Sequence, residues 1–143
     1  MFGPTGGEAV KANELMKPVT ALFPFAPVGV GMARRQMTAD LRAYGVAQSL
    51  LEDAQVVLSE LMANSVRHGR PLPSGRISAS WRVDAQGITV AVTDGGGATA
   101  PISVSASPLS MGGRGLSIVD ALSVDWGVRA DVGATTVYAV LAS

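Results

Sequence analysis

The most regular hydrophobic pattern in the chain lies in residues 48–68, where apolar positions recur every three or four residues. At about 100° per residue these positions fall on one side of a helix. They are Leu51, Ala54, Leu58 and Leu61. A helix over about residues 48–68 is therefore predicted, with Gly69 and Pro71 ending it.

A second run of helical period precedes this one. Its apolar positions are Val30, Ala33, Met37, Leu41 and Tyr44. Pro27 suits a first helical turn and Gly45 supplies a stop. Gly29 and Gly31 weaken the start of this helix, because glycine is a poor helix former.

The period changes to two after residue 76, which is typical of strands with one buried face. The alternating apolar positions are Ile77, Ala79, Trp81 and Val83, then Ile88, Val90 and Val92. Residues 84–87 between them resemble a hairpin loop. Residues 115–122 indicate a short helix, and residues 124–129 and 135–141 indicate two more strands. The β-rich run at 19–25 contains a proline, which favours an edge strand.

The predicted order is strand, helix, helix, strand, strand, long loop, helix, strand, strand. Alternation in most strands predicts a sheet with one buried and one solvent-exposed face, and hence an α+β fold. We expect a two-layer α/β sandwich, with a mixed, mainly antiparallel sheet and helices on one face. Residues 95–113 are long for a connection and are interpreted as a lid. Residues 1–17 are interpreted as a flexible tail, and residues 18–143 as one domain.

The composition of the chain limits the classes of function that it could have. The chain has 143 residues, is 48% hydrophobic and has a formal net charge of zero, which indicates a folded domain with a core. The lack of a basic surplus argues against direct nucleic-acid binding. The absence of cysteine excludes disulfides and thiolate metal sites, and fits a cytoplasmic protein. No stretch has the length of a membrane span or the form of a signal peptide.

The long helix also has a polar side. Glu60, Asn64, Arg67 and His68 lie within roughly a third of a turn, beside the apolar stripe. A carboxylate and an amide one turn apart can hold hydrated Mg²⁺ and activate a hydroxyl. The alternative is a solvated helix face that binds nothing.

Two glycine-rich segments flank the predicted lid. Asp94 precedes three glycines, including Gly96, and its carboxylate can accept a hydrogen bond from a ligand amine. The run 111–116 leads into a helix, and N–H groups at a helix N-terminus reached through glycines form an anion site. Arg114 adds a donor suited to phosphate. Each segment alone indicates only a turn, but their order after the long helix favours a ligand site.

These motifs resemble the GHKL (Bergerat-fold) ATP-binding domain over about residues 19–141. Among its branches, the chain most resembles the short anti-sigma-factor serine/threonine kinases of actinobacteria. The run 60–64 is similar to the N box, which implies that Glu60 is the general base and Asn64 the Mg²⁺ ligand. The run 94–97 is similar to the first glycine box, which implies that Asp94 binds the adenine amino group.

The resemblance implies further ATP-binding residues. The second glycine box, which closes over the phosphates, is similar to Gly113, Arg114, Gly115 and Leu116. The final box is similar to residues 133–136, which puts Thr136 near the adenine. Arg67, His68 and Gly96 complete the implied ATP-binding set. One departure is Ala98, which stands where the first box has its last glycine.

The resemblance therefore implies an anti-sigma factor that is also an ATP-dependent serine/threonine kinase, with ATP and Mg²⁺ as cofactors. Its partners would be a sigma factor and an anti-sigma-factor antagonist, and the family often forms homodimers. A module that binds the sigma factor without phosphoryl transfer is the alternative. The ATP-binding half of a sensor kinase is disfavoured, since no phospho-acceptor helix precedes residue 19. A gyrase-like role would need a transducer domain that the sequence lacks. We expect no direct nucleic-acid contact and no membrane association.

Overall fold

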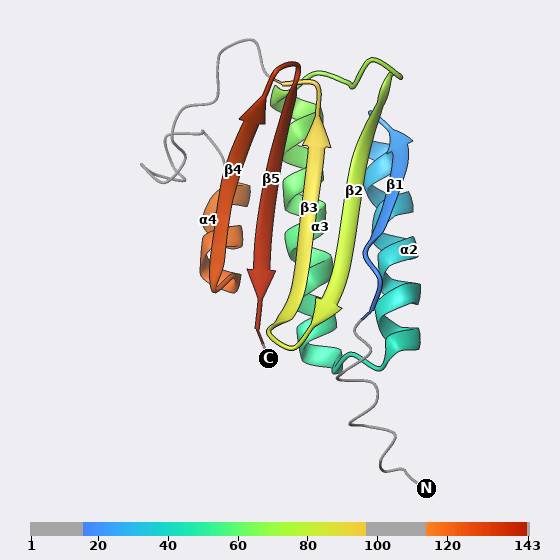
Figure 1. The fold of residues 1–143 in the computed structure, drawn as a ribbon, viewed down its shortest axis with the longest axis vertical. Coiled ribbons are helices and arrows are strands. Elements are labelled where there is room, and N and C mark those ends of the chain that lie inside the picture. The colour runs from blue at the N-terminus through green and yellow to red at the C-terminus, as the bar shows by residue number, and fades with distance from the viewer. Residues whose placement is uncertain (1–15, 97–113, 143) are drawn as a thin grey trace, which may run out of the picture.

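The computed structural model describes residues 16–96 and 114–142, which form three helices and one five-stranded sheet (Figure 1). Most of the expected tail, and residues 97–113 of the expected lid, lie outside the described residues. The elements are β1 (Val19–Pro24), α2 (Pro27–Tyr44), α3 (Gln48–His68), β2 (Arg76–Asp84), β3 (Gly87–Asp94), α4 (Arg114–Leu122), β4 (Asp125–Asp131) and β5 (Ala134–Leu141).

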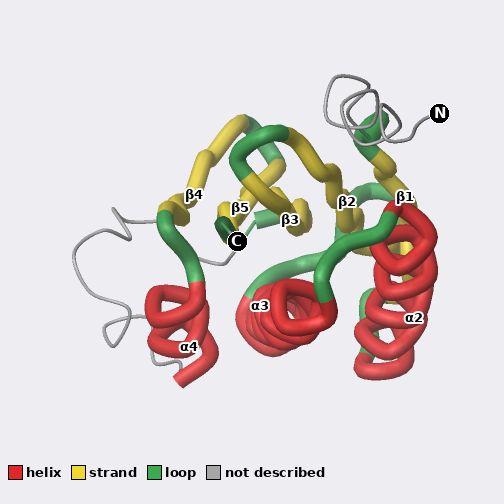
Figure 2. Tube along the Cα trace, turned by 90° about the horizontal axis from the view of Figure 1, so that it is seen from below, coloured by secondary structure: helices red, strands yellow, loops and turns green. Residues whose placement is uncertain are grey.

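The strands lie in the order β1-β2-β3-β5-β4, so β5 returns to the middle of the sheet after β4 has formed its edge. All three described helices cover one face of the sheet (Figure 2). The predicted α+β two-layer sandwich is thus confirmed. Each neighbouring pair of described strands is antiparallel, where a mixed sheet was expected. Among the described helices, none combines the length and hydropathy needed to cross a membrane.

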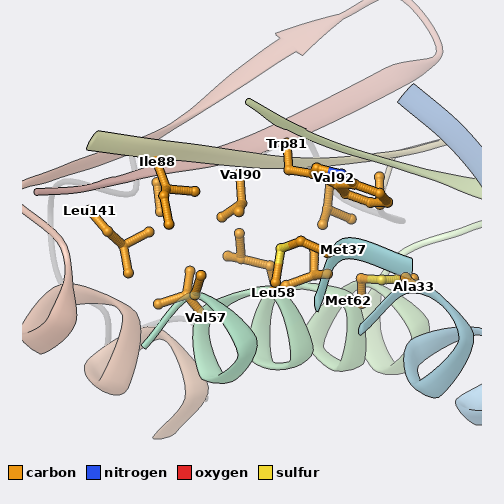
Figure 3. Close-up of a cluster of buried hydrophobic side chains, with 14 of the residues drawn as sticks. Ala33, Met37, Val57, Leu58, Met62, Trp81, Ile88, Val90, Val92 and Leu141 are labelled. Atoms are coloured by element: carbon orange, nitrogen blue, oxygen red, sulfur yellow. The ribbon is translucent and has the colours of Figure 1, made fainter. Parts of the chain in front are cut away.

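The core lies between α3 and the centre of the sheet. Val57, Leu58 and Met62 of α3 are each 0% exposed, and Val57 and Leu58 point at the strands (Figure 3). Cross-strand partners share a face of a sheet, and one row of such partners runs through Trp81, Val90 and Ala139 on the helix-covered side. The apolar stripe predicted for residues 48–68 is therefore the surface that attaches α3 to the sheet.

Helix α2 is attached to the sheet near both of its ends. Pro27 occupies its first turn, and Gly45 ends it at a φ of 94°, a left-handed conformation that glycine adopts without strain. Gly29 weakens the helix in isolation, but it is buried, and a Cβ at this position would collide with the Pro24 carbonyl oxygen of β1. Farther along, Asp40 accepts a 2.8 Å hydrogen bond from the indole N–H of the buried Trp81.

Helix α3 has the predicted bounds, whereas the C-terminal strands differ slightly from prediction. Strand β4 runs over Asp125–Asp131, not 124–129, because Ala130 and Asp131 still pair with β5. The turn that follows consists of Val132 and Gly133, and Gly133 has a φ of 74°. The last residues of β4 are exposed, so their hydrophobic pattern carried no strand signal.

Neighbouring valines of α3 give a direct test of this packing. Val57→Ala removes two methyl groups from a site that is 0% exposed, and should lower the free energy of unfolding by about 2–3 kcal/mol. Val56→Ala is the matched control at a site 40% exposed, where the better helix propensity of alanine should keep the change within about 0.5 kcal/mol. Urea unfolding of the three proteins measures both values. Equal losses at the two sites would contradict the described orientation of α3.

Candidate functional site

Two hydrogen bonds identify the flank of α3 that faces α2. Arg34 of α2 donates from Nη1 to Ser59 Oγ over 3.2 Å. Gln55 of α3 donates from Nε2 to Thr38 Oγ1 of α2 over 2.9 Å. With α2 on that flank and the sheet on the apolar side, the remaining flank of α3 faces α4 (Figure 2).

Glu60 and Asn64 lie on this remaining flank. Both are about 100–180° around the helix from Ser59 and Gln55 at 100° per residue. Both are half-buried, whereas Arg67 and His68 at the end of the helix are exposed. The predicted polar stripe therefore lies on the side of α3 that faces α4, with its two basic residues at the C-terminal end of the helix.

The Asn64 side chain holds an unpaired acceptor. Its Oδ1 is buried and has no hydrogen-bond partner in the described structure; the one other such side-chain atom there is Ser123 Oγ. A buried amide oxygen without a partner is costly, and it is the kind of hard oxygen that Mg²⁺ accepts as a ligand. Within residues 16–96 and 114–142, no three His, Cys, Asp or Glu side chains gather to form a metal site. The donor set thus fits a cation held mainly by ligand oxygens and water, with one amide from the protein.

Asp94 ends β3 as a buried carboxylate, 5% exposed. Its Oδ1 accepts a 2.7 Å hydrogen bond from the backbone N–H of Gly96. Gly96 has a φ of 93°, so the turn that makes this bond requires a residue that tolerates the left-handed region. The sequence-predicted pair of Asp94 and Gly96 therefore forms one local unit.

The loop after α3 brings Asp94 to the end of the polar stripe. The backbone N–H of Gly95 donates to the Arg70 carbonyl oxygen over 2.7 Å. A Cβ on Gly95 would collide with the Pro71 carbonyl oxygen, and one on Gly69 would collide with the Asp94 carboxylate. Figure 1 shows this loop crossing the sheet beside the end of β3 on its way to β2. Gly69 and Asp94, which are 25 positions apart in the sequence, are thus adjacent.

The register separates the two threonines of β5. Thr136 pairs with Thr93 on the sheet face away from the helices, where their hydroxyls lie 2.7 Å apart. Thr135 is the cross-strand partner of Asp94, and its Oγ1 lies 3.6 Å from where a Cβ on Gly96 would be. Of the two threonines, Thr135 is thus the one that shares the face of Asp94, and the role of Thr136 near the adenine stays a prediction. The alternation of side chains along β5 could have indicated this, but only if the register of β5 with Asp94 had been known.

The second glycine segment is described only from Arg114 onward, and Gly113 lies outside the described residues. Arg114 and Gly115 form the first turn of α4, one residue earlier than predicted. Leu116 follows them with its side chain 2% exposed in the core. That side chain is part of the packing, and the role of Leu116 in binding ATP stays a prediction.

Helix α4 is fixed at its far end to the edge of the sheet. Trp126 of β4 donates from Nε1 to Asp120 Oδ1 of α4 over 2.8 Å. Val119 and Leu116 of the same helix are buried in the core. The first turn of α4, whose N–H groups lack intrahelical partners, is consequently held relative to both α3 and the sheet.

Comparison with known sequences places the chain in a family. The sequence model of the histidine kinase-like ATPase domain matches residues 23–141, which is most of the chain. The chain therefore belongs to the histidine kinase-like ATPase family. A search among curated proteins found no match.

A solved structure shares the fold. It contains the RsbU and RsbW domains of Rv1364c from Mycobacterium tuberculosis, with a TM-score of 0.64 and 19% sequence identity. The match covers 89% of this chain and 33% of that one, so the chain spans about a third of the length of this relative.

The unpaired oxygen of Asn64 leads to an expectation for the ligand-free protein. Asn64→Ala should leave the thermal unfolding midpoint unchanged or raise it, because no hydrogen bond to Oδ1 is lost and alanine favours the helix. Asp40→Ala, on α2, is the control. It leaves the buried indole N–H of Trp81 without its acceptor and should lower the free energy of unfolding by about 1–3 kcal/mol. An Asn64→Ala loss as large as that of Asp40→Ala would show that the amide serves the fold.

Proposed function

We propose that the chain is an ATP-dependent serine/threonine protein kinase that phosphorylates an anti-sigma-factor antagonist and also binds a sigma factor. The observation that carries the proposal is the unpaired Asn64 oxygen, one helical turn from Glu60 on the α4-facing flank of α3. The buried Asp94 lies against the residue that follows this helix. Membership of the ATPase family supports nucleotide binding.

Each residue has a defined task in the proposal. Asp94 accepts a hydrogen bond from the adenine amine, with Thr135 beside it. The backbone at the start of α4, with Gly113, Arg114 and Gly115, holds the terminal phosphates, and Arg67 and His68 at the C-terminal end of α3 are further donors to them. Asn64 contributes its amide oxygen to Mg²⁺, which when bound offsets the negative charge of the phosphates.

Glu60 is the proposed general base. Its carboxylate accepts the proton of a serine or threonine hydroxyl on the partner protein, while that oxygen bonds to the γ-phosphorus and ADP leaves. Phosphoryl transfer depends mostly on positioning and charge stabilisation, so one base and one metal ligand from the protein are chemically sufficient.

The proposed partners come from the resemblance of the motifs to anti-sigma-factor kinases. The likeness of the fold to a protein with an RsbW domain supports the same assignment. A sigma factor, an antagonist and a second copy of the chain are the proposed protein partners, and the cytoplasm is the proposed location.

The proposal is tested by incubating the chain with a cognate antagonist, Mg²⁺ and ATP labelled on the γ-phosphate. Wild type should transfer label, and Glu60→Gln should transfer it about 10²–10⁴-fold more slowly while still binding ATP. Glu52→Gln, an exposed glutamate of the same helix, is the matched control and should keep the wild-type rate. Transfer by wild type no faster than by Glu60→Gln would overturn the kinase assignment.

A second candidate function is a sigma-factor-binding module that transfers no phosphate. Ala98 favours it, because the first glycine box ends there without its last glycine. Calorimetry separates the two candidates: a kinase should bind ATP with Mg²⁺ at micromolar concentration, and Asn64→Ala should weaken that binding. Millimolar or absent binding by wild type, with capture of a sigma factor intact, would favour the binding module.

A further inference from the structure

We propose that Gly69 determines the base selectivity of the nucleotide site, by leaving the space that the Asp94 carboxylate occupies. The inference rests on the proposed function, in which Asp94 accepts a hydrogen bond from the adenine amine. Gly69 itself contacts no nucleotide in this proposal and acts as a positioning residue.

The backbone at this position does not require glycine. Gly69 has φ −96° and ψ −161°, an extended conformation that any residue adopts. The reason for glycine is therefore space. A Cβ here would collide with Asp94 Oδ2 and would lie 2.9 Å from both Asp94 Cγ and the Ser65 carbonyl oxygen. Carbon and oxygen atoms that are not bonded do not approach so closely without displacement.

Neither side of this contact can easily move away. The Gly69 N–H donates to the Ser65 carbonyl oxygen over 2.7 Å, which fixes the residue to the end of α3. The following loop is bound to β3 by the 2.7 Å hydrogen bond from Gly95 to Arg70. The Asp94 backbone is paired with Thr135 in the sheet. The group left to yield is the carboxylate, which would have to give up its hydrogen bond from Gly96.

The carboxylate position matters because an ionised Asp only accepts hydrogen bonds. Adenine presents an amine donor at its 6-position, whereas hypoxanthine presents a carbonyl oxygen there. A correctly placed Asp94 therefore attracts the first base and repels the second. Gly69→Ala displaces the carboxylate, so it should remove this discrimination and leave the phosphate contacts in place.

The test measures the affinities of ADP and inosine diphosphate, each with Mg²⁺, by calorimetry. Wild type should prefer ADP by about 10–100-fold, the effect of one hydrogen bond to a charged group. Gly69→Ala should lower this preference to less than about threefold, through weaker ADP binding and nearly unchanged binding of inosine diphosphate. Gly31→Ala is the matched control, because a Cβ there meets Arg35 Nη1 at an ordinary 3.5 Å, and it should keep the wild-type preference.

Two results of the titration would overturn the inference. One is an undiminished preference for ADP in Gly69→Ala. The other is an equal loss of both nucleotides, which would mean that Gly69 supports the fold of the whole site without affecting the choice of base.

Thermal unfolding without nucleotide tests the contact independently of the proposed function. Gly69→Ala should lower the midpoint in the wild-type background, and most of that loss should vanish when Asp94 is already Ala. Equal losses in the two backgrounds would refute the contact. If wild type binds neither nucleotide, the proposed function is wrong. The unfolding comparison would still decide whether Gly69 holds Asp94 in place.

Discussion

Burial of one side of α3 against the middle of the sheet is the constraint on which the rest of the structure depends. Val57, Leu58 and Met62 bury fully there, and a helix anchored along that line cannot rotate without exposing them. Because rotation is fixed, the direction of every other α3 side chain is fixed too. Glu60 and Asn64 are thus oriented by residues on a different side of the helix.

The neighbours of α3 reinforce this orientation in different ways. Contacts with α2 are partly polar, through Ser59 and Gln55, and these directional bonds occupy the flank that Glu60 and Asn64 do not use. The opposite flank adjoins α4. The C-terminal end of α3 continues into the loop that contacts the residues around Asp94. Packing and polar bonding are therefore segregated around one helix, and Glu60 and Asn64 lie half-buried on the flank toward α4.

Much of this arrangement could be predicted from the sequence, because it depends on periodicity. The bounds of α3 and the split between its apolar and polar sides follow from spacing alone. The choice between Thr135 and Thr136 does not, since it requires the register of β3 with β5. The packing role of Leu116 and the contact of Gly69 with Asp94 were also beyond reach, because each depends on a tertiary neighbour distant in sequence.

The two tryptophans of the chain are attached to different helices by the same type of bond. Trp81 is 1% exposed and bonded to Asp40 of α2, whereas the bond between Trp126 and Asp120 of α4 lies at the surface. Indole emission depends on contact with water and on the hydrogen bond of the ring nitrogen. The intrinsic fluorescence of this protein is therefore a sum of two separable signals. One signal follows the integrity of the interior, and the other follows the distance between α4 and the sheet edge.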